Sequence, residues 1–277
     1  MTTSRFTSSV LKLGGEVVAD PTSLSLVLRD VASLVESGWR FVLCHGGGPQ
    51  TNALSEGLGL PVTKVAGQRV TDEPTLRVAC QAIAGEAGTT VVAAAWASGL
   101  RALGLSSGVV HGRRRPPASI PSEGGRVVDY GLVADVTRIE ADAIEACWSA
   151  GLTPVLSSIG VGEDRGGLYN INADTVAAAV AARLQVDHLF SVTAVAGVLR
   201  DRRDPSSRIP RLRASEARAA IAEGTIAGGM IPKVEEALAA LAGAGAVHIL
   251  APVAGALADE ARDPGSRGTV LLADLAG

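Results

Sequence analysis

The chain has 277 residues, of which 47% are hydrophobic and only 3% aromatic, and its formal net charge is −3. This length suits one large or two modest α/β domains, and the mixed charges exclude a dominant basic face, so nucleic acid is not expected as a partner. The sequence shows no secretory signal pattern, and we expect no membrane-spanning run, no membrane partner and a cytoplasmic location.

The first predicted elements alternate between strands and helices. Residues 6–13 predict a strand, 23–37 an amphipathic helix, 40–44 a second strand and 50–58 a second helix. Both strands are followed by glycines. This rhythm is typical of a doubly wound parallel sheet, in which ligands bind beyond the carboxyl ends of the strands.

The middle of the chain is less regular. Residues 62–70 predict a hairpin, and Thr71 or Asp72 is expected to cap a long Ala-rich helix that runs toward Trp96. A strand, a protruding hairpin, a helix, a strand and a helix are then predicted, in that order, at residues 103–105, 109–130, 140–150, 153–157 and 174–184.

The pattern restarts after Val186, where we predict a soft boundary between two domains, residues 1–186 and 187–277. Four further strands and two helices are expected in the second part. The strands are predicted at residues 188–193, 195–200 and 247–250, the helices at 214–223 and 230–242, and a last edge strand at 269–272.

Two lysines lie beside glycines near opposite ends of the chain. Lys12 precedes the glycines at 14–15, and Lys233 follows those at 228–229. Exposed glycine N–H groups, two cations and a carboxylate are what phosphoryl transfer between two anions requires, because positioning and charge neutralisation supply nearly all of its catalysis. The alternatives are a solvated lysine at a strand end and glycines that serve tight turns alone.

A third glycine cluster occupies residues 46–48, at the start of the second predicted helix. Successive unshielded N–H groups and the helix dipole both favour an anion there. A flexible turn is the alternative.

The segment 170–174 is unusually polar, with two Asn and one Asp in five residues. Asn172 or Asp174 could simply cap the following helix. The group exceeds what a cap needs, however, and Asp174 could orient both lysines through its charge.

Arginines suggest two further features. Arg69 lies in an apolar stretch and is either a clamp for a carboxylate or a partner in a surface salt bridge. The run 113–115 is expected to be a solvated hairpin rather than a recognition patch.

Other phosphate-binding signatures are absent from the sequence, namely Gly-x4-Gly-Lys-Ser/Thr, the protein-kinase loops and Gly-x-Gly-x-x-Gly after a strand. The four histidines are scattered, and Cys44, Cys80 and Cys147 lie far apart in apolar surroundings. We therefore expect free thiols and no metal site built from protein side chains.

Taken together and in this order, from Leu11 to about Leu272, these motifs resemble those of the amino acid kinase family. The resemblance implies an α/β fold, an open three-layer αβα sandwich with a mostly parallel central sheet. Its N-terminal part would bind an acyl amino acid and form a homodimer, and its C-terminal part would bind ATP. The implied reaction is phosphorylation of the γ-carboxylate of N-acetyl-L-glutamate, the second step of arginine biosynthesis, with Mg²⁺ arriving on the ATP phosphates.

The resemblance also implies roles for single residues. Lys12 and Lys233 would neutralise the migrating phosphoryl group, and Asp174 would organise the two lysines. The positions implied for the acyl amino acid are Gly47 and Gly48 as donors to the attacking carboxylate, Arg69 for the α-carboxylate, and Asn170. The positions implied for phosphate or ATP are Gly14, Gly15, Thr193, Ala194, Gly197, Val198, Leu199, Thr225, Ile226, Ala227, Gly229 and Met230.

The chain departs from the family pattern in three places. Ala194 stands where the family usually has Asp, and the stretch 104–108 is short and lacks an Asp. Only eleven residues precede Lys12, which predicts a dimer that is insensitive to arginine.

Two other functions stay open. A kinase for α-aminoadipate or glutamate linked to an acidic carrier protein would suit the arginines at 113–115, since opposite charge steers association. A catalytically silent regulatory paralogue is motivated by Ala194. N-succinyl-L-glutamate in place of N-acetyl-L-glutamate as the free substrate is a finer variant of the implied reaction.

Overall fold

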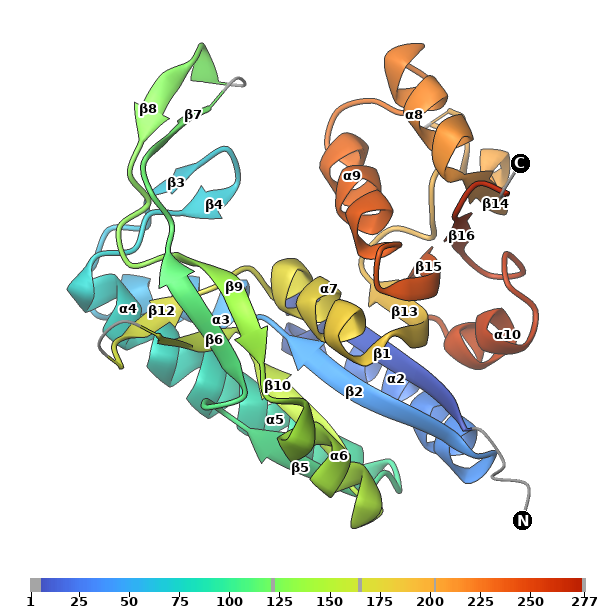
Figure 1. Ribbon diagram of the computed structural model, residues 1–277, viewed down its shortest axis with the longest axis horizontal. Coiled ribbons are helices and arrows are strands. Elements are labelled where there is room, and N and C mark those ends of the chain that lie inside the picture. Colours follow the sequence, from blue (N-terminus) through green and yellow to red (C-terminus); the bar gives the residue numbers. More distant parts are fainter. Residues whose placement is uncertain (1–5, 121–122, 164–165, 202, 276–277) are drawn as a thin grey trace.

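The computed structural model describes residues 6–120, 123–163, 166–201 and 203–275. Its centre is an eight-stranded sheet in which all neighbouring strands are parallel except one pair at the C-terminal side, β15 and β16 (Figure 1). In spatial order the strands are β14 (Arg211–Arg213), β16 (Thr269–Leu272), β15 (Ala244–Leu250), β13 (Val186–Val192), β1 (Thr7–Leu13), β2 (Trp39–His45), β10 (Thr153–Ser157) and β5 (Ala102–Leu105). The expected mostly parallel sheet is confirmed.

Helices cover both faces of this sheet because its strands are apolar on both sides. In β1, Val10 packs with residues of α7 and α9, whereas Leu11 packs with residues of α2 and α10 on the opposite face. One face is covered by α6 (Ala141–Ser149), α7 (Ala173–Leu184), α8 (Ala214–Ala222) and α9 (Met230–Ala240). The other is covered by α1 (Gly15–Ala19), α2 (Pro21–Glu36), α5 (Gly88–Ala97) and α10 (Ala256–Arg262).

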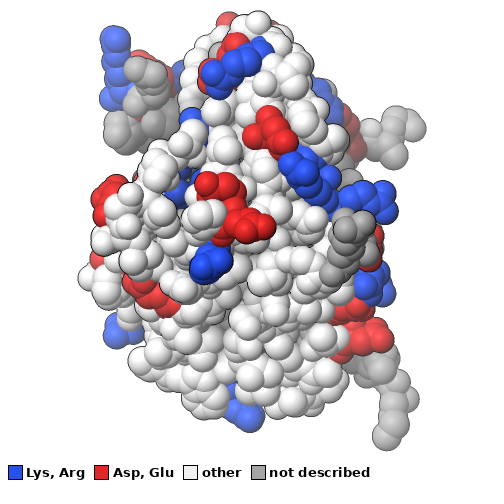
Figure 2. All heavy atoms as spheres, turned by 90° about the vertical axis from the view of Figure 1, so that its left-hand side faces the viewer, with Lys and Arg blue, Asp and Glu red and all other residues white. Residues whose placement is uncertain are grey.

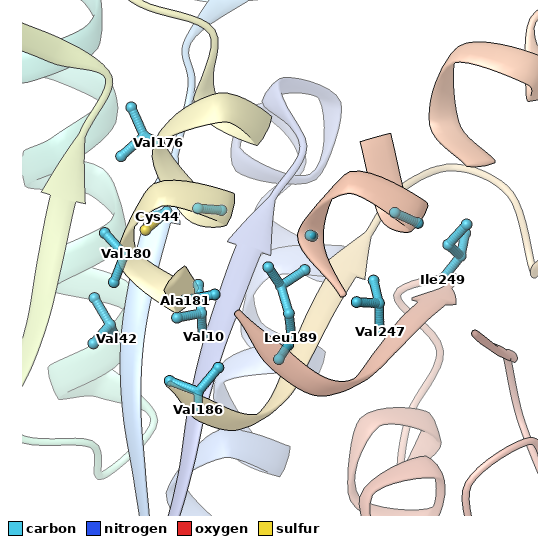
Figure 3. Packing of buried hydrophobic residues seen from close by; sticks show 14 of the residues in the cluster. Val10, Val42, Cys44, Val176, Val180, Ala181, Val186, Leu189, Val247 and Ile249 are labelled. Carbon is cyan, nitrogen blue, oxygen red and sulfur yellow. The ribbon is translucent and has the colours of Figure 1, made fainter. Parts of the chain in front are cut away.

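The core on the first face contains residues of β1, β2, β13, β15, α7 and α9. Figure 3 shows Val10 and Leu189 of the sheet beside Val180 of α7, with Val247 on the neighbouring strand. Cys44 is buried in the same cluster, and this burial raises the pKa of its thiol. The thiol is therefore a core group rather than a reactive one.

A smaller four-stranded sheet lies beside the N-terminal half. Its strands, in the order β12-β11-β6-β9, are Leu168–Asn170, Ile159–Gly162, Val110–Arg114 and Ala134–Ile139. Two hairpins, β3–β4 (Lys64–Val65 and Gln68–Arg69) and β7–β8 (Ala118–Ile120 and Arg126–Val128), project from it at the upper left of Figure 1. The protruding hairpin was expected, but the strands at its base join a sheet that the sequence did not predict.

Several predicted elements differ in the structure. Residues 195–200 form no regular strand, because Gly197 has φ +137° and the N–H of Val198 donates to Thr269 Oγ1 at 2.8 Å. The strand at 269–272 exists but is not the sheet edge, since β14 pairs outside it. Helices α1 and α10 had no predicted counterpart.

One long helix begins after Asp72, whose carboxylate accepts the N–H of Thr75 at 2.9 Å. It comprises α4 (Glu73–Ala79), the π-helical segment η1 (Cys80–Ala87) and α5. By length and composition alone, Glu73–Ala97 could cross a membrane, contrary to the expectation of no such run. In the fold it packs against α2, α3 (Gly48–Gly57), β5 and β10, as a core helix of a globular protein does.

The two predicted domains share the central sheet. β1 of the first part pairs in parallel with β13 of the second, with Val10 opposite Leu189. The division at residue 186 stays a prediction.

Candidate functional site

Three strands of the sheet end at the same place and bring the glycine motifs together. Leu13 at the end of β1 lies opposite His45 of β2 and Val192 of β13. The glycines at 14–15 and 46–48 and the residue Thr193 therefore follow neighbouring strand ends. This is the edge at which parallel α/β sheets bind ligands.

Lys12 points toward α7 because side chains alternate along a strand and Val10, two residues earlier, packs on that face. Its Nζ lies 2.8 Å from Oδ1 of Asp174, in the first turn of α7. The helix cap is a different residue, since Asn172 Oδ1 accepts the N–H of Asp174 at 3.1 Å. The carboxylate of Asp174 is thus free to pair with the lysine.

Lys233 reaches the same place from α9, and its Nζ donates to Thr193 Oγ1 at 2.6 Å. Burial lowers the pKa of Lys233, and the positive charge of Lys12 lowers it further, while Asp174 opposes the shift. The two ammonium groups are therefore close enough to repel one another. An anion placed between them would relieve this repulsion.

These residues line one cleft of about 510 Å³. Most of the positions predicted from the sequence border it. They are Lys12, Gly14, Gly15, Gly47, Gly48, Arg69, Asn170, Asp174, Thr193, Ala194 and Lys233.

The glycines of the cleft differ in what they can do. A Cβ on Gly15 would lie 2.7 Å from Pro49 Cδ, so the two glycine loops meet there. The N–H of Gly14 donates to Val192 O at 3.0 Å and is not available to a phosphate. A Cβ on Gly48 would meet nothing within 4 Å, because that position faces the open cleft.

Arg69 marks the other end of the cleft, on the β3–β4 hairpin. Its Nη2 donates to Asn52 Oδ1 and to the carbonyl of Gly48, the latter at 3.4 Å. Its Nη1 is buried and has no hydrogen-bond partner among the described residues, and burial lowers the pKa of the guanidinium. An unpaired buried donor of this kind suits a carboxylate. Asn170 lies nearby and donates to Thr71 Oγ1 at 3.2 Å.

The other positions predicted for the nucleotide do not line this cleft. The side chains of Val198 and Ile226 are buried in the core, so a nucleotide could meet only their backbone. The remaining positions outside the cleft lining are Gly197, Leu199, Thr225, Ala227, Gly229 and Met230. Their nucleotide contacts stay predictions.

Arg115 lines the cleft, contrary to the prediction that all three arginines at 113–115 lie in a solvated hairpin. Arg113 and Arg114 are exposed, as expected, but Arg115 is only 21% exposed and lines the cleft. It lies 2.6 Å from Asp135 of β9 and donates to Gln68 Oε1 at 2.6 Å, which links the β3–β4 hairpin to the smaller sheet. Nothing in the run of three arginines distinguishes the third, because its environment depends on pairing with distant strands.

Two more contributors had no clear sequence signal. Glu236 of α9 lies near the two lysines, and the π-helical segment η1 places Ile83 against Gly47, at 3.1 Å from a Cβ built there. Such π-helical turns are frequent at functional sites.

The described residues contain no group of three His, Cys, Asp or Glu side chains that could hold a metal ion. The carboxylate in the cleft closest to both lysines, Asp174, already pairs with Lys12.

Comparisons with known proteins agree with this geometry. Residues 8–251 match the amino acid kinase family. The chain belongs to that family. It is 48% identical over 268 residues to an acetylglutamate kinase of Sorangium cellulosum, with 95% of this chain and 94% of the relative covered. It is 44% identical to an acetylglutamate kinase of Anaeromyxobacter dehalogenans, with 96% and 98% covered.

A solved structure supports the fold of this family member. The N-acetylglutamate synthase of Neisseria gonorrhoeae, complexed with coenzyme A and N-acetyl-glutamate, superposes with a TM-score of 0.79 at 26% identity. The match covers 98% of this chain and 60% of that one. The αβα arrangement expected from the sequence is therefore confirmed.

Proposed function

We propose that this chain transfers the γ-phosphoryl group of ATP to the γ-carboxylate of N-acetyl-L-glutamate, the second step of arginine biosynthesis. The observation that carries the proposal is the meeting of Lys12, Asp174 and Lys233 around one cleft. The names of the relatives that cover nearly the whole chain point to the same reaction.

The reaction needs positioning and charge neutralisation more than proton transfer. The γ-carboxylate is already ionised at neutral pH, so no general base is required. One of its oxygens forms a bond to the γ-phosphorus while the bond from that phosphorus to the bridging oxygen of ADP breaks. Lys12 and Lys233 face the transferring group from two sides and stabilise its negative oxygens, and Asp174 orients Lys12.

The acyl amino acid would lie between the glycine loop of β2 and the β3–β4 hairpin. Gly47 and Gly48 begin α3, where backbone N–H groups lack helical partners and can donate to the γ-carboxylate. Arg69 would bind the α-carboxylate through its unpaired Nη1, with Asn170 beside the acyl group. Groups that can bind a carboxylate thus lie at both ends of this part of the cleft, the glycines at 47–48 at one end and Arg69 at the other. This arrangement suits a substrate with two carboxylates.

The nucleotide would approach from the α9 side, past Thr193, Ala194 and the segments 197–199 and 225–230. Gly15 would donate its N–H to a phosphate oxygen, and Gly14 would give close access through its lack of a side chain. Mg²⁺ would be carried by the ATP phosphates and would neutralise part of their charge.

We also propose a cytoplasmic homodimer that forms through the N-terminal half. β5 is the edge strand of the central sheet, and beside it Trp96 is 53% and Leu103 is 43% exposed. Figure 2 views the molecule from the left-hand side of Figure 1 and shows charges of both signs, with a broad area of few charges in its lower part. Sedimentation of wild type and Trp96→Glu tests this, with a dimer expected only for the wild type.

An ADP-release assay with free N-acetyl-L-glutamate tests the proposed reaction. We expect turnover with the free substrate. Turnover only with a carrier-linked α-aminoadipate or glutamate would replace our proposal with the carrier-dependent kinase, and no turnover with either would favour the silent paralogue. The hypothesis of a carrier-dependent kinase is less well supported, because the arginines that would attract an acidic carrier already have acidic partners. Arg114 pairs with Asp129 at 2.9 Å, and Arg113 lies 3.8 Å from Glu163.

A further inference from the structure

Helix α9 presents a second charged residue on the side that faces the lysines. Glu236 follows Lys233 by three residues, a spacing that puts both side chains on one face of a helix. Both border a cavity of about 150 Å³ behind the main cleft, between α7 and α9. Lys12 and Asp174 border this cavity too, above an apolar floor from β13 and β15.

Glu236 links α9 to the start of α7. Its Oε1 accepts a long hydrogen bond of 3.4 Å from Nδ2 of Asn172. The other side-chain atom of Asn172, Oδ1, caps α7 by accepting the N–H of Asp174. A single carboxamide therefore connects the helix that carries Lys233 to the helix that carries Asp174.

The charges around Glu236 come from three elements. Lys12 of β1 and Lys233 of α9 favour its ionised form, whereas Asp174 of α7 opposes it. Burial of the carboxyl, together with Asp174, raises the pKa of Glu236 to about 7, although the outer side of the residue is exposed to solvent. Both protonation states are therefore populated at neutral pH.

We propose that Glu236 is a positioning residue whose carboxyl ties α9, and with it Lys233, to Asn172, and whose charge opposes the phosphates of an incoming nucleotide. This inference rests on the proposed kinase function. The protonated carboxyl keeps a carbonyl oxygen that accepts from Asn172, and it adds no negative charge. The ionised carboxyl keeps the tie but competes with phosphate oxygens for Lys12 and Lys233.

Nucleotide affinity should therefore fall as pH rises through about 7. We expect the Kd for ADP with Mg²⁺ to increase about tenfold between about pH 6 and pH 8, as one added like charge at close range allows. In Glu236→Gln the amide oxygen still accepts from Asn172, and the side chain at position 236 no longer titrates. Its Kd should therefore be low at pH 6 and should not increase toward pH 8, since ionisation of the ADP phosphate itself strengthens attraction to the lysines.

The hydrogen bond between Glu236 and Asn172 can be tested separately from the charge of Glu236. Glu236→Ala removes the acceptor and the charge together, so kcat should fall about fivefold below that of Glu236→Gln while the two melting temperatures agree. This comparison leaves Asn172 unchanged, so the cap of α7 is not disturbed. Glu235→Gln is the matched control, because Glu235 is exposed on the same helix and does not border either cavity.

The experiment is calorimetric titration of wild type, Glu236→Gln and Glu235→Gln with ADP and Mg²⁺ at pH 6 and pH 8, followed by turnover measurements on these three proteins and on Glu236→Ala. The inference holds if Glu236→Gln alone loses the increase of Kd with pH. The same pH dependence in wild type and Glu236→Gln, or equal kcat for the Gln and Ala variants, overturns it. A pH-dependent Kd without turnover of N-acetyl-L-glutamate would support the role of Glu236 and refute the proposed function.

Discussion

The ammonium of Lys12 lies 2.8 Å from the carboxylate of Asp174, and the two side chains are only 14% and 24% exposed. Lys12 lies one residue before the end of β1, and Asp174 lies in the first turn of α7, which packs over that strand. The pair is held by the sheet and the helix rather than by flexible loops. A site built in this way keeps its geometry before substrates arrive.

Replacement of Asp174 by Asn should separate orientation from folding. The amide has the same shape but cannot hold the Lys12 ammonium by charge, so kcat should fall about a hundredfold with a melting temperature close to that of wild type. Steady-state turnover and thermal unfolding of the same preparation measure both. A kcat within twofold of wild type would remove the pair from the mechanism.

Arg69 should control substrate affinity. Loss of its guanidinium removes a charged hydrogen bond of about 2–3 kcal/mol, so Arg69→Ala should raise KM for N-acetyl-L-glutamate by about thirtyfold or more. Arg69→Lys should recover only part of this, since an ammonium lacks the planar fork. Arg114→Ala is the control, because Arg114 is exposed and pairs with Asp129. An unchanged KM in Arg69→Ala would place the α-carboxylate elsewhere.

Two glycine-to-alanine changes should behave in opposite ways. Gly15→Ala puts a methyl group 2.7 Å from Pro49 Cδ and 3.2 Å from the Gly48 nitrogen, so it should lower the melting temperature and activity together. Gly48→Ala meets no atom within 4 Å and should fold normally, but its methyl group enters the cleft and should raise KM. Equal melting temperatures for the two variants would contradict the close approach of the glycine loops.

Stability should fall in acid through three hydrogen-bonded side chains, His188 of β13, His248 of β15 and Glu260 of α10. His188 Nδ1 lies 3.0 Å from His248 Nε2, and His248 Nδ1 lies 2.9 Å from Glu260, which also accepts backbone N–H groups. Burial and the neighbouring His248 lower the pKa of His188 to about 4. Between about pH 6.5 and pH 4 the unfolded chain therefore binds a proton that the folded chain does not.

This difference removes up to about 3 kcal/mol of the free energy of unfolding as pH falls through that window. Urea unfolding at pH 7 and pH 4.5 measures it. His188→Asn should lose less stability than wild type over the same interval. Parallel losses in the two proteins would show that His188 does not titrate in the folded state as described.

Local patterns predicted the parts of the site that follow strand ends. Apolar runs ended by glycine located β1 and β2 and placed Lys12 near the end of β1. Parallel strands then bring their carboxyl ends to one edge, whatever their separation in the chain. The choice of Asn172 as the cap, which leaves Asp174 for Lys12, needed coordinates because both residues cap helices equally well.

The surroundings of Arg115 and Glu236 depend on contacts between elements that are separate in the sequence, so local sequence patterns could not predict them. The second sheet joins short strands from distant segments, and it is this sheet that turns Arg115 into the cleft and leaves Arg113 in solvent. Glu236 lies in the helix predicted at 230–242, and no sequence motif distinguishes it from the other charged residues of that helix. Its environment depends on how α9 packs against α7, a relation that no local pattern encodes.

Trapping of the acyl phosphate with hydroxylamine tests the central claim most directly, because only a phosphorylated carboxylate yields the hydroxamate. With ATP, Mg²⁺ and N-acetyl-L-glutamate, the wild type should form the hydroxamate. Lys12→Ala and Lys233→Ala should each lower its rate by about a hundredfold or more while binding of N-acetyl-L-glutamate stays similar. Hydroxamate formation at the wild-type rate in either lysine variant would contradict the account.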